Sequence, residues 1–385
     1  MNKKNILIID DSALMRRLLS DIICSDDRFA VKDLATNGLE GLDYIVKNHT
    51  LYDAVILDIN MPKMNGLEVL EQLQKHRIKV TVLMVSTLTK EGAKETIIAL
   101  ERGAFDFVTK PENYLEAKGT DFKSRLLEML ALATNLEPSR TADIASKPAN
   151  KVDLSASIEA KRNKATDYVA VNKRIQFLPH KKYVGNKTGK KKLVALACST
   201  GGPKSLQAVI PKLPKDLDAP VVLVQHMPAG FTNSLAQRLN DISQVSVKEA
   251  ADGEIIRKGH VYIAPGGKQM RIINDRNGYR ISVVDEPARD GLRPCANIMY
   301  ESLMNSDFDE ITCVVLTGMG ADGTNGIGML GEKRNLHVIA QNEETCVVYG
   351  MPKAIAEAKQ VDQVLPLENI ADAITKNVGV LSDGR

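Results

Sequence analysis

Five side chains that could bind a cation and a phosphoryl group each follow a short apolar stretch of the sequence. They are Asp10, Asp11, Asp58, Ser86 and Lys110, and the stretches before them are Ile6–Ile9, Ala54–Leu57, Val80–Val85 and Phe105–Thr109. Each stretch has the length and composition of a buried β-strand. Because the carboxyl ends of parallel strands share one edge of a sheet, we expect these side chains to meet in one crevice.

Such a crevice would hold three carboxylates, one hydroxyl and one ammonium group. Three carboxylates repel one another unless a cation offsets their charge, and an all-oxygen site of this kind suits Mg²⁺ with retained waters. The hydroxyl and the ammonium group beside them could hold phosphoryl oxygens. A single Asp after a strand often only caps a helix or supports a turn. The occurrence of all five at successive strand ends instead favours a site that holds a cation and phosphoryl oxygens.

A second group of side chains, further along the chain, could support nucleophilic catalysis. Ser199, His226 and Asp322 each follow an apolar stretch that is typical of a strand. The stretches are Leu193–Cys198, Pro220–Gln225 and Ile311–Thr317. The glycines after Ser199 permit a sharp strand-to-helix turn and let backbone N–H groups point at a reacting oxygen. A serine needs a base to become nucleophilic, and that base needs an acid to fix its tautomer.

Each of these three residues has a structural explanation when it is considered alone. A serine before Gly-Gly is usually a turn or cap residue, and a single histidine at a strand end is usually structural. Their convergence on one sheet edge favours a serine-hydrolase site. The pattern differs from the Gly-x-Ser-x-Gly elbow of the α/β-hydrolases, because Ala197 occupies the first glycine position and the order is Ser, His, Asp. We therefore expect a different scaffold.

The elements that must position the first group alternate between strand and helix five times within residues 1–133. One helix is expected to begin with Ser12 as its N-cap and to place Leu14, Leu18 and Ile22 four apart on one face. The other helical patterns lie at Gly38–Lys47, Leu67–Lys75 and Glu91–Arg102. This alternation predicts a flavodoxin-like (βα)5 domain, with a parallel sheet covered by helices on both sides.

For residues 191–385 the pattern predicts a doubly wound, mostly parallel α/β sheet. Strands are expected near Leu193, Val221, Val245, Val261, Ile311, His337 and Val361. The segment Met270–Val284, which contains Asn277-Gly278, predicts an appended antiparallel hairpin.

Residues 134–190 have the composition of a basic flexible linker. Between Glu137 and Lys192 there are fourteen Lys or Arg against five Asp or Glu, and little apolar periodicity. A basic run such as Lys190-Lys191-Lys192 could contact nucleic acid, but it lacks interleaved aromatic residues and a helix-turn-helix pattern. We therefore expect a solvated tether and no nucleic-acid partner.

The bulk composition limits the class of protein. A length of 385 residues suggests two or three domains, and 44% hydrophobic with 26% charged residues is typical of a globular protein. No apolar run reaches the roughly 18 residues of a membrane span, and the N-terminus does not resemble a signal peptide, so we expect a cytoplasmic protein without membrane insertion. The five cysteines include no Cys-x-x-Cys pair, which predicts buried free thiols.

The first 125 or so residues resemble a response-regulator receiver domain. The matching features are the acidic pair, the acceptor aspartate followed by Met61-Pro62-Lys63-Met64-Asn65-Gly66, the Ser/Thr position and the Lys-Pro pair. The resemblance implies that a chemotaxis histidine kinase phosphorylates Asp58. It also implies that Mg²⁺ is surrounded by Asp10, Asp11, Asp58 and the backbone carbonyl of Asn60, and that Ser86 and Lys110 contact the phosphoryl group.

Four segments beyond the linker match the chemotaxis protein-glutamate methylesterase family, in which a receiver is tethered to a serine-hydrolase domain. They are Cys198-Ser199-Thr200-Gly201-Gly202, residues 225–232, residues 263–267 and residues 316–323. The resemblance implies that Ser199, His226 and Asp322 are catalytic and that backbone groups near Thr200 and Met319 bind the oxyanion. This sequence departs from the family's usual pattern at Cys295, where the family commonly has Ser.

The same resemblance implies the substrates and the regulation. The substrates would be methyl-esterified glutamates on chemoreceptors, with glutamine deamidation as a second activity and no cofactor for either reaction. The unphosphorylated receiver would cover the approach to Ser199, and phosphorylation would loosen the contact.

Two other functions fit parts of the sequence. The series Gly318-x-Gly320-x-x-Gly323, with Glu343 twenty residues further on, satisfies the dinucleotide-binding fingerprint. However, Asp322 would place a carboxylate where a pyrophosphate should sit at a helix N-terminus. A transcriptional regulator that used the basic linker would need a recognition helix, and the sequence contains no such pattern.

Overall fold

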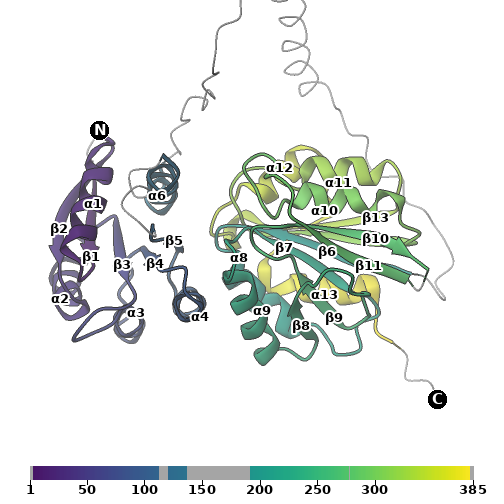
Figure 1. Ribbon diagram of the computed structural model, residues 1–385, viewed down its shortest axis with the longest axis horizontal. Helices are drawn as coiled ribbons and strands as arrows, with labels where there is room; N and C mark the ends of the chain where they lie inside the picture. The colour runs from purple at the N-terminus through teal and green to yellow at the C-terminus, as the bar shows by residue number, and fades with distance from the viewer. Residues whose placement is uncertain (1–2, 112–119, 137–190, 277, 382–385) are drawn as a thin grey trace, which may run out of the picture.

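The computed structural model describes residues 3–111, 120–136, 191–276 and 278–381, which form two α/β units (Figure 1). The predicted linker, residues 134–190, lies almost entirely outside the described residues.

The first unit is built on a five-stranded parallel sheet with the order β2-β1-β3-β4-β5. Its strands are β1 (Lys4–Ile9), β2 (Phe29–Ala35), β3 (Ala54–Asp58), β4 (Val82–Ser86) and β5 (Asp106–Thr109). Every residue of β3 and β4 is buried, because helices cover both faces of the sheet. The predicted flavodoxin-like fold is confirmed. β4 begins two residues later than predicted, and Ser86 is its last residue.

Side-chain caps set the starts of the helices in this unit. Ser12, Asn37, Asn65 and Thr89 each accept a hydrogen bond from a backbone N–H three residues further on. The helices are α1 (Ala13–Cys24), α2 (Gly38–Asn48), α3 (Gly66–Lys75), α4 (Lys90–Glu101) and α6 (Thr120–Ala133), with a 3₁₀ turn η1 (His49–Leu51) after α2.

The face of α1 that carries Leu14, Leu18 and Ile22 is only partly buried. The buried residues of α1 are Leu19, Ile22 and Ile23, whereas Leu14 is 64% exposed. At 100° per residue, Leu14 lies half a turn around the helix from Ile23, so burial of the later residues directs Leu14 toward solvent.

The second unit is built on a seven-stranded sheet with the order β14-β13-β12-β6-β7-β9-β8, and all its ladders are parallel. Its strands are β6 (Lys192–Cys198), β7 (Val221–Gln225), β8 (Ser246–Glu249), β9 (His260–Ile263), β12 (Glu310–Val315), β13 (Leu336–Gln341) and β14 (Gln363–Leu365). β12 ends at Val315, before the predicted Thr317, because Gln341 Oε1 accepts the Thr317 N–H. The predicted doubly wound sheet is confirmed.

The predicted hairpin is also present. Strands β10 (Gln269–Asp275) and β11 (Gly278–Val284) pair antiparallel, with Asp275 opposite Gly278. Asn277, predicted at its turn, lies outside the described residues.

Helices cover both faces of the seven-stranded sheet (Figure 1). The helices are α8 (Gly202–Val209), α9 (Phe231–Ile242), α10 (Ala296–Ser302), α11 (Thr324–Gly331), α12 (Met351–Glu357) and α13 (Leu367–Val378), with 3₁₀ turns η2 (Ile210–Lys212), η3 (Leu303–Asn305) and η4 (Glu343–Thr345). The residues of β6 alternate between two cores. Val194 and Leu196 pack with α8, α9 and α13, whereas Leu193 and Ala195 pack with α10, α11 and α12.

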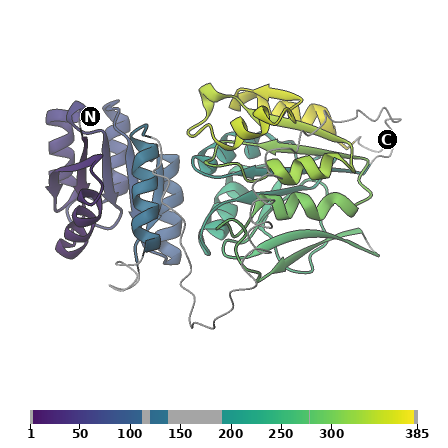
Figure 2. The same ribbon diagram turned by 90° about the horizontal axis from the view of Figure 1, so that it is seen from above.

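The two units are in contact through helices α4, α8 and α9 (Figures 1 and 2). Phe107 of β5 stacks on Phe231, the first residue of α9, with ring centroids 4.6 Å apart. Nearby, Arg238 donates two hydrogen bonds to the carboxylate of Glu101, at 2.6 and 3.1 Å. One hydrophobic cluster therefore continues from the first sheet into the second.

No helix among the described residues is both long and apolar enough to cross a membrane. All five cysteines are free thiols. Cys198, Cys295 and Cys313 are buried as predicted, but Cys24 is exposed and Cys346 is only partly buried. Cys24 ends α1 one residue beyond the buried stripe, so its side chain faces water.

Candidate functional site

Four of the predicted receiver residues meet at the carboxyl edge of the first sheet. Carboxylate oxygens of Asp10, Asp11 and Asp58 lie within 4.8 Å of one another. Lys110 Nζ lies 2.8 Å from Asp58 Oδ2 and 3.0 Å from Asp10 Oδ2. The chain thus brings together the acidic pair after β1, the end of β3 and the residue after β5, as expected from parallel strands.

The electrostatics of this cluster suit a divalent cation. Burial raises the pKa of the Asp58 carboxyl to about 6, Lys110 opposes this effect, and the charge of Asp10 adds to it. Asp10 Oδ2 is buried and accepts no hydrogen bond among the described residues, although Lys110 lies close to it. A buried carboxylate oxygen that is ion-paired with one lysine, in a cluster of three carboxylates, fits Mg²⁺.

The two remaining receiver residues are joined to helix α4. Ser86 Oγ donates to the carbonyl of Gly92 at 3.2 Å, and Thr96 Oγ1 lies 2.6 Å from Ser86 Oγ. Asn60 Nδ2 donates to Glu95 Oε2 at 3.1 Å. Both side chains are therefore held by α4, the helix that also packs against the second unit.

The predicted nucleophile lies on the turn between β6 and α8. Gly201 has a φ of +75°, and a Cβ there would lie 2.4 Å from Val347, so only glycine fits the turn. From β7, Gln225 Nε2 donates to the carbonyl of Ser199 at 3.0 Å and to that of His226 at 3.1 Å. One buried amide therefore fixes the backbone of the nucleophile and of the base together.

The predicted base and acid form a direct pair. His226 Nε2 lies 2.8 Å from Asp322 Oδ2, which leaves Nδ1 as the imidazole nitrogen that can act on a substrate or on Ser199. Asp322 also accepts from the backbone N–H groups of Ala296 at 2.6 Å and Asn297 at 2.9 Å. Burial alone would raise the pKa of Asp322, but His226 and these backbone donors hold it below its usual value. The carboxylate is therefore ionised beside the imidazole.

Ser199 and His226 line one cavity of about 350 Å³, together with Thr200 and Met319. No hydrogen bond joins Ser199 Oγ to His226 among the described residues. This agrees with the behaviour of many substrate-free enzymes, in which catalytic hydrogen bonds tighten only when the substrate binds.

Two backbone N–H groups are available beside the nucleophile. Within the described residues, the N–H groups of Thr200 and Met319 donate to no other group. A Cβ at Gly318 would lie 2.7 Å from Ser199 Cβ, so this glycine lets the turn after β12 approach the turn after β6. The arrangement suits stabilisation of an oxyanion formed at Ser199.

The receiver contributes to the same cavity. Its lining includes five residues of the first unit, namely Asp106, Phe107, Val108, Thr109 and Arg125. The cavity is therefore a joint feature of both units.

Comparison with known proteins assigns the family. Residues 194–374 match the family described as CheB methylesterase, and residues 6–117 match the response regulator receiver domain. The protein-glutamate methylesterase/protein-glutamine glutaminase of Clostridium acetobutylicum is 38% identical over 382 residues, which cover 98% of this chain and 99% of that protein. The Bacillus subtilis protein of the same name is 38% identical over 373 residues, covering 97% and 98%. The chain belongs to the CheB methylesterase family.

Two crystal structures from Thermotoga maritima each match one unit of this CheB-family chain. The CheB methylesterase catalytic domain is 40% identical and covers 49% of this chain and 99% of its own, with a TM-score of 0.48. The response regulator domain of CheB is 38% identical and covers 36% and 100%, with a TM-score of 0.31. The sequence-based identification as a receiver-linked methylesterase and glutaminase is confirmed by the family and its full-length relatives.

Sequence reasoning did not assign a role to two residues that organise the CheB-family site, Gln225 and Asn297. Asn297 Oδ1 accepts from the backbone N–H groups of Gly323 at 3.1 Å and Gly326 at 2.7 Å. These donors open helix α11, so they are not free to bind a pyrophosphate. The dinucleotide-binding alternative therefore receives no support from the structure. Gln225 lies within a matching segment, but only the fold shows that its amide faces the carbonyl of Ser199.

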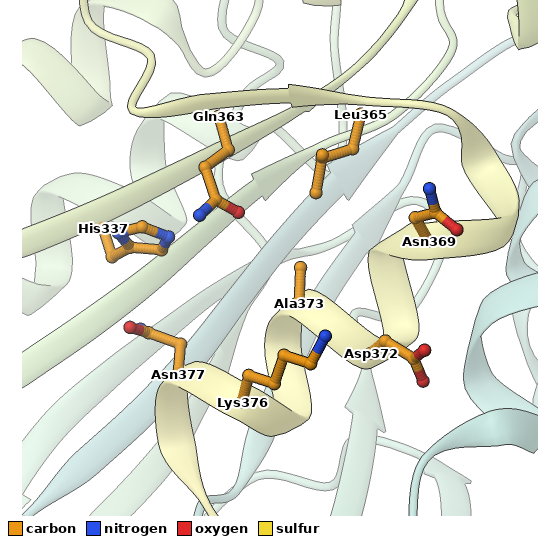
Figure 3. A pocket seen from close by; sticks show the side chains of 8 residues that line it. All are labelled: His337, Gln363, Leu365, Asn369, Asp372, Ala373, Lys376 and Asn377. Atoms are coloured by element: carbon orange, nitrogen blue, oxygen red, sulfur yellow. The ribbon is translucent and has the colours of Figure 1, made fainter.

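A larger hollow of about 530 Å³ lies between β14 and α13, away from the predicted residues (Figure 3). Its lining is His337, Gln363, Leu365, Asn369, Asp372, Ala373, Lys376 and Asn377. It contains no serine or cysteine beside a base, and it holds none of the chemistry of the CheB family.

Proposed function

We propose that Ser199 is the nucleophile with which this CheB-family enzyme hydrolyses glutamate methyl esters and glutamine amides of chemoreceptors. His226 acts as the base, and Asp322 fixes its tautomer. The observation that carries the assignment is that His226, which is paired with Asp322, lines the same cavity as Ser199.

The reaction begins when Ser199 Oγ attacks the side-chain carbonyl carbon of the substrate. His226 Nδ1 takes the hydroxyl proton, and the negative charge on the substrate oxygen is stabilised by the N–H groups of Thr200 and Met319. His226 then gives the proton to the leaving group, and an acyl-enzyme remains on Ser199. Water, activated by the same imidazole, releases the glutamate product.

One site can serve both substrates because they differ only in the leaving group. An ester releases methanol and a primary amide releases ammonia, but both pass through the same acyl-enzyme. Neither reaction needs a cofactor, since the nucleophile, the base and the oxyanion donors all belong to this chain.

We propose Asp58 as the phosphoryl acceptor for a chemotaxis histidine kinase. Asp10, Asp11, Asp58 and the carbonyl of Asn60 would hold Mg²⁺, which when bound neutralises the charge on the transferring phosphoryl group. Lys110 is already within reach of Asp58, and its ammonium group would contact a phosphoryl oxygen. Ser86 would reach the same group after its side chain turns away from α4.

Helix α4 offers the route by which phosphorylation reaches the active site. If Ser86 turns toward the phosphoryl group, it leaves Gly92 and Thr96. Because α4 also packs against α8 and α9, a change in α4 alters the contact between the two units. Interfaces of this kind are modest in size, so a few kcal/mol is enough to change access to the active site 10- to 100-fold.

The test of this function is methanol release from methylated receptor, measured with and without a small-molecule phosphodonor. Release that depends on Ser199 and increases with the phosphodonor supports both the nucleophile and the regulation. The partners that follow are the kinase and the chemoreceptors, with the enzyme acting at the cytoplasmic side of the receptors.

A further inference from the structure

The carboxylate of Asp322 has a fourth donor that the triad reaction does not account for. Besides His226 and two backbone N–H groups, the thiol of Cys295 lies 3.3 Å from Asp322 Oδ1. His226 and the Ala296 N–H bind Oδ2, while the Cys295 thiol and the Asn297 N–H bind Oδ1. Each carboxylate oxygen therefore receives two hydrogen bonds.

Cys295 is fixed in place and is present as a neutral thiol. It is 1% exposed, and its backbone N–H donates to Gln269 Oε1 at 2.9 Å. Gln269 is itself fully buried and donates to the carbonyl of Leu292 at 3.1 Å. Burial and the charge of Asp322 raise the pKa of the Cys295 thiol to about 12, so the S–H proton is present at neutral pH.

We propose that Cys295 is a positioning residue for the hydrolysis, whose thiol donates to Asp322 Oδ1 and sets the orientation and charge that this carboxylate presents to His226. The inference rests on the proposed roles of His226 and Asp322. A thiol is a weak donor, so it holds Oδ1 in place while it withdraws little charge from the carboxylate. A hydroxyl would withdraw more, and an alanine would withdraw none.

If Cys295 has this role, the pH profile of hydrolysis depends on the donor present at position 295. His226 carries a positive charge while it holds the proton of Ser199, and Asp322 stabilises that charge. Other charged groups that line the cavity are Asp106 and Arg125 of the receiver and Arg293. They are the same in every variant, so a difference between variants comes from the donor at position 295.

The experiment compares full-length wild type, Cys295→Ala and Cys295→Ser, each saturated with phosphodonor. In Cys295→Ala we expect the acidic limb of kcat/KM for methylated receptor to move to higher pH by about half a pH unit. The reason is that the His226 imidazolium is then better stabilised. A shift of this size is about threefold in the protonation equilibrium of the imidazole. Cys295→Ser should move it in the opposite direction or leave it in place. kcat should fall severalfold in Cys295→Ala and recover in Cys295→Ser, with KM little changed.

Cys313→Ala is the matched control, since Cys313 is an equally buried thiol of β12 that does not contact the triad. It should keep the wild-type pH profile, and thermal unfolding should show that all variants are folded. The proton NMR signal of the imidazole N–H that faces Asp322 gives a second readout, which is independent of turnover. It should change in Cys295→Ala and not in Cys313→Ala.

Two results would overturn the inference. One is a pH profile and an imidazole signal that are identical in wild type and Cys295→Ala. The other is an equal loss of kcat in Cys295→Ala and Cys295→Ser without any shift of the acidic limb, which would mean that the thiol only fills space. Failure of the triad assignment is distinguishable, because it would leave Ser199→Ala active while the imidazole signal still responded to position 295.

Discussion

Phe107 of the receiver stacks on Phe231 of the catalytic domain, with ring centroids 4.6 Å apart and planes inclined by 21°. Phe107 follows the buried carboxyl of Asp106 and precedes the strand end that leads to Lys110. Phe231 begins helix α9, five residues after His226. The stacked pair therefore lies close in sequence to Lys110 on one side of the contact and to His226 on the other.

Replacing this ring should release the receiver without phosphorylation. Phe107→Ala is expected to weaken docking by about 1–2 kcal/mol and to raise basal methanol release roughly 5- to 30-fold, up to the phosphorylated level. Arg238→Ala removes an exposed ion pair with Glu101, which is worth about 0.2–1 kcal/mol, and should raise basal methanol release less than about fivefold. Equal basal activity in wild type and Phe107→Ala would show that the stack does not hold the receiver in place.

The nucleophile can be tested with a matched serine. Ser199→Ala should reduce both methanol and ammonia release by several orders of magnitude, because no acyl-enzyme can form. Ser205→Ala changes a buried serine of α8, outside the cavity, and should stay near wild type. Addition of His226→Ala to Ser199→Ala should cause little further loss, since the two act as a unit. Wild-type turnover by purified Ser199→Ala would remove Ser199 from the mechanism.

Phosphoryl transfer should be specific to one aspartate. Asp58→Asn should abolish Mg²⁺-dependent labelling by a phosphodonor and the rise in esterase activity, because an amide cannot form the acyl phosphate. Asp43→Asn, an exposed aspartate of α2, is the control and should label normally. Asp10→Asn should weaken Mg²⁺ binding, since it removes a buried ligand oxygen. Labelling that survives in Asp58→Asn would place the acceptor elsewhere.

The inhibited state should be sensitive to pH through Asp106. Burial raises the pKa of this carboxyl above its usual value, while Arg125, the Phe107 N–H and the neighbouring Thr200 and Gly201 oppose the rise. When the receiver leaves, water reaches Asp106 and its pKa falls.

The direction in which docking changes with pH follows from the difference between the pKa of Asp106 in the docked and in the released receiver. Asp106 binds its proton more tightly in the docked receiver than in the released receiver. Docking is therefore most stable at pH values below the pKa of Asp106 in the released receiver. It weakens as the pH rises toward the higher pKa of Asp106 in the docked receiver. The ratio of basal to phosphodonor-stimulated activity should therefore increase with pH. This ratio cancels the pH dependence of the triad itself. Asp106→Asn should flatten it, and a flat ratio in wild type would contradict the assignment.

The fold class and the candidate site residues could both be predicted from the amino-acid sequence alone. Strand-length apolar runs, each followed by a polar residue, are a local signal, and parallel strands necessarily bring their carboxyl ends to one edge. This logic placed Asp10, Asp58 and Lys110 in one cluster, and Ser199 and His226 in one cavity. Its errors were also local. Cys24 was expected to be buried but is exposed, and the apolar spacing of Leu14, Leu18 and Ile22 did not say which face of the helix meets the sheet.

The side-chain contacts that hold and cover these residues are visible only in the folded chain. Gln225, Asn297 and Cys295 act through side-chain hydrogen bonds to segments distant in the sequence, and no periodicity encodes such partners. The fold likewise shows that the imidazole nitrogen of His226 that contacts Asp322 is Nε2. The packing of α4 on α8 and α9 joins elements of two different sheets, and the sequence pattern of each sheet carries no information about the other.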